Sequence, residues 1–331
     1  MCIRDRKWRE ISLPVGYRAS TLRKENLLES INISSEKLDG TIWNFGDTKV
    51  EEILTKLDLA GVPLSSVSKV GKGMETGSNK AFEIEQELYD LMKPKFSKMV
   101  FPRMSNSGIK SYQLQPAKKY LLYPEGVKSF DELPEEFRKH LSVSRTELED
   151  RAAFKRGNCD WWRYTWPLHK ELFHLPKIVS PYMATTSTFA VDSENLAMYL
   201  TDTTVIYLTN PDIPIHALCA LLNSDILDFR FHYLTKLKGG GVKEFFAKQV
   251  EKQPIPFNPQ NSELTRRLNE LGLAMRASLD EIASTQIERE KQVLNTGIAQ
   301  LKSEINQCVA KLFDITSDEL AFICETKASW T

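Results

Sequence analysis

Leu175-Pro-Lys-Ile-Val179 opens the segment that decides the fold, and Gln253-Pro-Ile-Pro-Phe257 closes it. Short β-rich runs bounded by prolines or turn residues predict strands over residues 176–181, 189–192 and 203–208. A further strand is expected over 248–257. Between these strands, the broad apolar face of residues 216–233 predicts one helix. A triple glycine at 239–241 marks a turn, so the segment predicts a sheet with an inserted helix.

Helical patterns are inserted in the β-rich part upstream of this scaffold and form the tail downstream of it. Apolar residues recur with helical spacing over 50–59, and residues 40–45 are typical of a strand. Residues 141–154 are expected to form another helix. Two apolar stripes over 264–282 and 287–312 predict an antiparallel helical hairpin. Thr316-Ser-Asp-Glu319 matches a capping box before a final apolar run. Together these patterns predict an α+β fold.

Composition excludes some classes of protein and leaves others open. The chain has 44 basic and 44 acidic residues among 331, so its net charge gives no indication of a nucleic-acid partner. The five cysteines form no Cys-x-x-Cys pair and no disulfide framework, which favours a reducing compartment. No apolar run approaches the roughly 20 residues that span a bilayer. We therefore expect a cytoplasmic protein with no membrane partner.

A glycine-rich segment lies between two expected strands. Thr76, Gly77 and Asn79 form its centre, flanked by Lys72 and Lys80. Exposed backbone amides and hydroxyls in such a loop suit phosphate oxygens. A plain hairpin turn fits the spacing better. The segment lacks the Gly-Lys-Ser/Thr of a nucleotide-binding loop.

Residues 91–124 carry basic side chains without an acidic residue among them. The basic members are Lys93, Lys95, Lys98, Arg103, Lys110, Lys118 and Lys119. Interleaved aromatic residues and the amides of Asn106, Gln113 and Gln115 suit a surface that faces phosphates and base edges. A solvated face whose counter-charges come from elsewhere in the fold is an equally good interpretation.

Two further segments allow more than one interpretation. Trp161, Trp162 and Trp166, with Arg156 and Arg163 nearby, fit a stacking site or an aromatic mini-core under a loop. Residues 236–243, which include Lys238 and Lys243, fit a phosphate contact or a helix end and turn. His169, His174 and Cys159 meet no metal-site spacing, so no metal is expected.

The ordered motifs resemble the TaqI-like C-terminal specificity domain of type IIG restriction–modification enzymes and adenine-specific DNA methyltransferases. The motifs are Thr76-Gly-Ser-Asn-Lys-Ala-Phe82, Pro176-Lys-Ile178, Leu221-Leu-Asn-Ser224, Pro254-Ile-Pro256, and Ile305 to Phe313 followed by Glu319. The resemblance covers roughly residues 60–325. The family's catalytic half carries a glycine-rich cofactor loop and an Asn-Pro-Pro-Tyr motif, and this chain contains neither.

The resemblance implies three parts: a linker or remnant of a missing methyltransferase domain over residues 1–60, a target recognition domain over 61–257, and a helical tail over 258–331. It implies sequence-specific binding of double-stranded DNA without catalysis by this chain. S-adenosylmethionine would be the cofactor of the parent enzyme, and this chain would hold none. The alternative is a protein-docking module of a restriction or phage-defence complex.

The resemblance and the charge pattern together give a set of candidate DNA contacts. Base-edge contacts are assigned to Arg103, Asn106, Gln113 and Gln115. Phosphate contacts are assigned to Lys72, Lys80, Lys93, Lys95, Lys110, Lys118, Lys119, Arg156, Arg163, Lys238 and Lys243. Each correct base-edge contact is worth about 1–3 kcal/mol of discrimination.

Overall fold

The computed structural model describes residues 8–11, 30–33, 48–194 and 197–330. The chain divides into two compact units, residues 1–55 and 56–331. In the first unit, β1 (Trp8–Ile11) pairs antiparallel with β2 (Ser30–Ile33). Helix α1 (Thr48–Leu59) crosses the boundary and confirms the helix expected over 50–59. The strand expected over 40–45 lies outside the described residues.

A four-stranded antiparallel sheet forms the centre of the second unit. Its order is β12 (Ala190–Asp192), β10 (Lys177–Pro181), β13 (Thr203–Leu208) and β4 (Ser68–Lys72). Every residue of β10 and β13 is buried, as expected of short β-rich runs covered on both faces. These two strands pair with Ile178 opposite Ile206. The expected strands at 176–181, 189–192 and 203–208 are confirmed.

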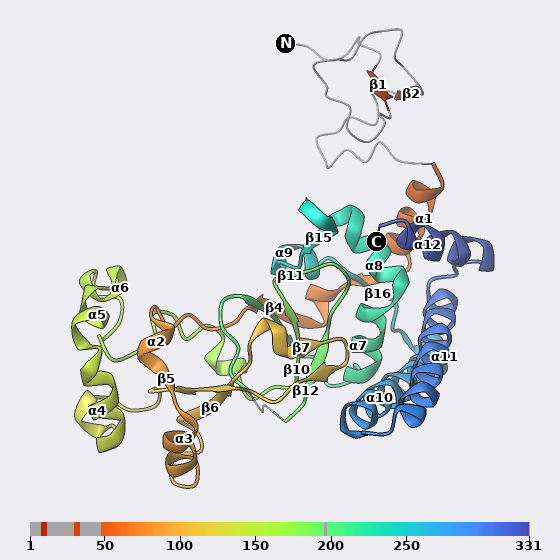
Figure 1. Ribbon diagram of the computed structural model, residues 1–331. Helices are drawn as coiled ribbons and strands as arrows, with labels where there is room; N and C mark the ends of the chain where they lie inside the picture. Colours follow the sequence, from red (N-terminus) through yellow and green to blue (C-terminus); the bar gives the residue numbers. More distant parts are fainter. Residues whose placement is uncertain (1–7, 12–29, 34–47, 195–196, 331) are drawn as a thin grey trace. The chain divides into compact units, whose positions relative to one another are not determined.

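A second group of elements follows β4 and packs around its own core, at the left of Figure 1. A three-stranded antiparallel sheet has the order β5 (Glu83–Ile84), β9 (Lys119–Leu122), β6 (Val100–Arg103). The helices are α2 (Asn79–Phe82), α3 (Gln86–Met92), α4 (Glu135–Val143), α5 (Arg145–Asp150) and α6 (Ala152–Lys155). Phe82, Leu121 and Phe137 are fully buried in this core.

The single helix expected over 141–154 is wrong, because the chain breaks at two points there. Ser144 separates α4 from α5, and Arg151 separates α5 from α6 with an extended backbone (φ −59°, ψ 137°). The Arg151 guanidinium donates to the backbone carbonyls of Thr76 and Trp161, both at 2.6 Å. These tertiary hydrogen bonds hold the break in place.

Three smaller pairings involve the other strands of the second unit among the described residues. Strand β7 (Ile109–Lys110) pairs with β8 (Gln113–Leu114), and β16 (Pro254–Ile255) pairs with β3 (Val62–Pro63). A third sheet has the order β11 (Met183–Ala184), β15 (Val242–Glu244), β14 (Leu237–Lys238). The strand expected over 248–257 is wrong at its start, where α9 (Ala247–Val250) precedes β16.

The helix expected over 216–233 is two helices, α7 (Ile215–Asn223) and α8 (Asp225–Leu234). Ser224 is extended between them (φ −64°, ψ 151°), and its hydroxyl accepts a hydrogen bond from the Leu227 backbone amide at 3.2 Å. Asn223 exchanges two hydrogen bonds with the Phe189 backbone, at 2.9 and 2.8 Å. A capping serine after a tethered asparagine therefore ends one helix and begins the next.

The tail forms three helices, drawn in blue in Figure 1: α10 (Ser262–Ser284), α11 (Glu288–Leu312) and α12 (Ser317–Ala328). Helix α10 packs against both α11 and α7. The antiparallel hairpin of α10 and α11 and the capping box of Thr316 and Glu319 confirm the sequence predictions. The fold is α+β, as predicted. Among the described residues, no helix is both long and apolar enough to cross a membrane.

Candidate nucleic-acid interface

The glycine-rich segment packs against the protein instead of forming a hairpin. Strand β4 pairs with β13 and β5 pairs with β9, so the two flanking strands do not meet. Thr76 Oγ1 donates to Asn79 Oδ1 at 2.7 Å, and Thr76 is buried. Gly77 has φ +80°, and a Cβ there would lie 2.1 Å from Thr165 Oγ1. The hairpin prediction is wrong, and this loop instead starts α2.

The basic stretch receives a counter-charge from a neighbouring strand. Arg103 and Lys119 lie opposite each other in β6 and β9. Glu83 on β5 forms ion pairs with both, at 2.6 Å to Lys119 Nζ. The Arg103 side chain is only 18% exposed. The run of one sign in the sequence is thus partly neutralised in the fold, as the solvated-face alternative expected.

The other base-edge candidates differ in how far the fold engages them. Asn106 Oδ1 accepts from Thr203 Oγ1 at 3.2 Å. Gln113 Nε2 donates to Asp280 Oδ1 of α10 at 2.7 Å. Gln115 is exposed, and its side chain has no hydrogen-bond partner in the described part of the chain. Gln115 is therefore the base-edge candidate whose side-chain amide can bind a ligand without first breaking a hydrogen bond to the described part of the chain.

The phosphate candidates divide into exposed cations and cations that the fold engages. Exposed and without an acidic partner among the described residues are Lys80, Lys95, Lys110, Lys118 and Arg156. The ion-paired ones are Lys72 with Glu75, Lys119 with Glu83, Lys238 with Glu244, and Arg163 with Asp160 and Glu125. Lys93 donates weakly to two backbone carbonyls. The exposed group carries the positive charge that remains available to an anionic partner.

Lys243 does not occupy the surface that a phosphate contact requires. Its side chain is 1% exposed, and its ammonium pairs with Asp228 Oδ1 at 2.7 Å. Burial lowers the pKa of this ammonium, and the Asp228 carboxylate opposes the shift. The assignment of Lys243 to an exposed phosphate contact is therefore wrong, because the residue alternates into the protein interior from β15.

The tryptophan cluster is divided between core and surface. The rings of Trp161 and Trp162 lie 4.6 and 6.3 Å from the ring of Phe130, and Trp162 is buried. These two form the aromatic mini-core given as one alternative. Trp166 is 48% exposed, and Lys72 Nζ lies 5.9 Å from the centre of its ring.

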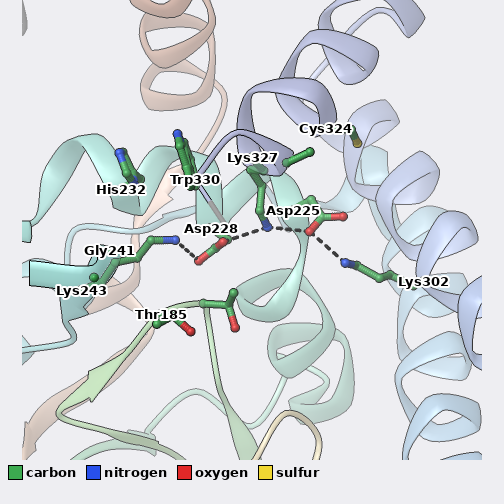
Figure 2. A pocket seen from close by; sticks show the side chains of 13 residues that line it. Thr185, Asp225, Asp228, His232, Gly241, Lys243, Lys302, Cys324, Lys327 and Trp330 are labelled. Atoms are coloured by element: carbon green, nitrogen blue, oxygen red, sulfur yellow. Dashed lines mark hydrogen bonds and ion pairs between the residues drawn. The ribbon is translucent and has the colours of Figure 1, made fainter. Parts of the chain in front are cut away.

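A cluster of charged residues on α8, α11 and α12, shown in Figure 2, was not expected from the sequence. Lys327 Nζ lies 2.5 Å from Asp225 Oδ1 and 2.8 Å from Asp228 Oδ2. Burial raises the pKa of both carboxyls, but the nearby ammonium groups outweigh it and hold both pKa values below the usual range. The two aspartates are three residues apart, which places them on one helix face. This spacing is the feature of the sequence that could have indicated the cluster.

The described residues contain no group of three or more His, Cys, Asp or Glu side chains placed to hold a metal ion.

Among the histidines, burial and the Lys243 charge lower the pKa of His232 to about 4, so its imidazole is neutral at physiological pH. Burial raises the pKa of the Cys219 thiol to about 12, which leaves it unreactive as a nucleophile. The arrangement of exposed cations and amides suits binding of a polyanion.

The sequence of this chain is similar to sequences of known proteins. Residues 101–255 match the TaqI-like C-terminal specificity domain. The chain is 23% identical over 243 residues to the type II methyltransferase M.BstVI of Geobacillus stearothermophilus, covering 68% of this chain and 41% of the relative. It therefore spans about two-fifths of that relative's length. The resemblance predicted over residues 60–325 is confirmed for residues 101–255.

The fold is also similar to a solved structure of the type IIL restriction–modification enzyme MmeI in complex with DNA. The TM-score is 0.55 at 12% sequence identity, and the similarity covers 81% of this chain and 36% of that chain. At this identity the likeness concerns the fold alone.

Proposed function

We propose that this chain recognises a short sequence in double-stranded DNA within a restriction–modification system, because residues 101–255 match the TaqI-like C-terminal specificity domain. The proposal rests on two observations taken together. One is the family match, and the other is a set of exposed cations that have no acidic partner among the described residues. Lys110 and Lys118 lie inside the matched region and flank the exposed Gln115 in the sequence. Cations that flank a free amide are the arrangement expected for phosphate positioning around a base contact.

We further propose that recognition serves a methyltransferase half of the parent enzyme. The relative M.BstVI is a type II methyltransferase, and the present chain spans about two-fifths of its length. The resemblance favours adenine as the methylated base and S-adenosylmethionine as the cofactor of that half. In this scheme the present chain selects the DNA site and performs no chemistry itself.

Selection from a randomised duplex pool tests sequence recognition. The purified chain is incubated with the pool at low and at moderate salt, and the retained duplexes are sequenced. Enrichment of one short motif that persists at moderate salt is the expected result. Salt-sensitive retention without enrichment contradicts sequence recognition by this chain alone. A folded sample that retains no DNA at either salt concentration contradicts DNA binding and favours the protein-docking alternative.

A charge variant tests whether the exposed cations form the interface. Lys110→Gln with Lys118→Gln is expected to reduce the slope of log affinity against log salt by about 1.8, or roughly 0.9 for each lost phosphate contact. The matched control is Lys139→Gln with Arg266→Gln. These two cations are 74% and 66% exposed, but each is paired to a carboxylate one helical turn away. Equal slopes in the two variants would place the interface elsewhere.

A further inference from the structure

A cavity of about 640 Å³ lies beside the charged cluster of Figure 2. Helix α8 forms one wall, and α11 and α12 contribute Lys302 and Lys327. The loop after β11 contributes Thr185 and Thr186, and the glycine turn between β14 and β15 contributes Gly240. The volume falls within the range of small-molecule sites. None of the functional roles assigned above uses this cavity.

The charges that line the cavity form a chain with one cation in excess. The order is Lys243, Asp228, Lys327, Asp225, Lys302, with each neighbouring pair within 3.2 Å. Three ammonium groups thus face two carboxylates, and the Figure 2 view shows them side by side along the cavity. The ammonium group in excess of the carboxylates is where an anion would bind most favourably.

The excess positive charge is accessible to solvent at only one end of this row of five charged side chains. At the closed end, the Lys243 side chain is 1% exposed and its Nζ lies 4.9 Å from the centre of the Trp330 ring. At the open end, the Lys302 side chain is 60% exposed. Its 3.2 Å contact is to Asp225 Oδ1, which also accepts Lys327 at 2.5 Å. Lys302 therefore shares its acceptor and keeps N–H donors for a ligand.

Hydroxyl groups line the same cavity as Lys302. Thr185 and Thr186 are both exposed and both line the cavity. Thr186 and Lys302 also line a second cavity of about 260 Å³, which reaches Ser111. Ammonium and hydroxyl donors around a space for a compact ligand suit a tetrahedral oxyanion with several acceptor oxygens. The Trp330 ring stacks on the His232 ring, 3.7 Å away between ring centres, so that face is not open to a ligand.

We propose that this cavity binds a phosphate group, held by the Lys302 ammonium and the hydroxyls of Thr185 and Thr186. A backbone phosphate of bound DNA and free inorganic phosphate present the same oxygens. If the phosphate group belongs to bound DNA, the proposal rests on the proposed function. It then deepens that function, because it adds the α11 side of the protein to the DNA interface.

Residue-specific lysine reactivity tests the site in the full chain. The chain is acetylated with a succinimidyl ester in phosphate-free buffer, alone, with millimolar inorganic phosphate, or with a duplex, and each lysine is quantified by mass spectrometry. Lys302 is expected to be protected, whereas Lys311, exposed on the same helix and outside the cavity, is not. Protection by phosphate alone identifies free phosphate as the ligand, and protection by the duplex identifies a DNA phosphate. Protection by neither overturns the site.

Two sets of variants test whether Lys302 is part of a binding site or is merely solvated. They also test the site independently of the proposed function. Thr185→Ala with Thr186→Ala is expected to abolish the protection of Lys302, and unchanged protection would overturn the assignment of the hydroxyls. If the chain binds DNA, Lys302→Gln lowers the salt slope by about 0.9 and Lys311→Gln leaves it unchanged. A chain that binds no DNA refutes the proposed function, and the inorganic phosphate experiment still decides the site.

Discussion

Replacing Lys327 by methionine is predicted to destabilise the chain strongly. The Lys327 side chain is 14% exposed, and its ammonium contacts two carboxylates of α8 that are 13% and 1% exposed. Methionine keeps much of the side-chain volume and removes the charge. The variant then leaves two largely buried carboxylates with one lysine each, Lys302 for Asp225 and Lys243 for Asp228.

The magnitude follows from the burial of these carboxylates. Breaking a buried ion pair by removing one partner typically costs about 3–5 kcal/mol, because the remaining charge is uncompensated. Both aspartates keep one cation here, so we expect a loss near the lower limit, about 3 kcal/mol. This is a large fraction of the roughly 5–15 kcal/mol that stabilises a typical protein.

Urea unfolding followed by far-ultraviolet circular dichroism measures the effect. The midpoint is expected to fall in Lys327→Met while the m-value stays unchanged. The control is Lys302→Met in the same chain of charges. Because Lys302 is 60% exposed, its pair is expected to contribute at most about 1 kcal/mol. If Lys327→Met costs no more than Lys302→Met, the buried charges are not a source of stability.

Three further predictions concern pH, helix capping and base recognition. The free energy of unfolding is expected to fall as the pH drops below about 4. Although burial raises the pKa of Asp228, Lys327 and Lys243 bring it below its unfolded value, so the unfolded state takes up the proton first. Urea titrations from pH 6 to pH 3 measure this, and an identical pH dependence in Lys327→Met would contradict it. Thr316→Ala removes the cap hydroxyl that accepts a hydrogen bond from the Glu319 amide and should cost about 1 kcal/mol, seen as faster amide exchange in α12. Unchanged exchange would exclude the capping role. Gln115→Ala should weaken binding to the selected DNA motif by about 1–3 kcal/mol and leave binding to unrelated duplexes intact, whereas equal losses would make it a non-specific contact.

Patterns that depend on neighbouring residues were predictable from the sequence. The β-rich run at 203–208 is a buried strand, and the stripes over 264–282 and 287–312 are an antiparallel pair of helices. The capping box at Thr316 begins a helix. Periodicity and capping act within a few residues along the chain, so these elements follow from the local sequence.

The helix breaks required contacts between segments far apart in sequence. Apolar spacing continues through residues 216–233, yet Ser224 caps a new helix and Asn223 bonds to Phe189, 34 residues away. Likewise, the breaks around α5 coincide with hydrogen bonds from Arg151 to Thr76. Local spacing contains no information about such partners, so it predicts uninterrupted helices.

The availability of each charge was decided by the tertiary structure alone. In the sequence, Lys119, Lys243 and Lys110 are equivalent basic residues. In the fold, Glu83 pairs with Lys119, Asp228 pairs with the buried Lys243, and Lys110 stays exposed. The sequence alone predicted the resemblance that holds for residues 101–255, the main strands and the helical tail, because their signals are local or follow the order of motifs. Electrostatic pairing depends on distance in space, so only the folded chain distinguishes the free cations from the neutralised ones.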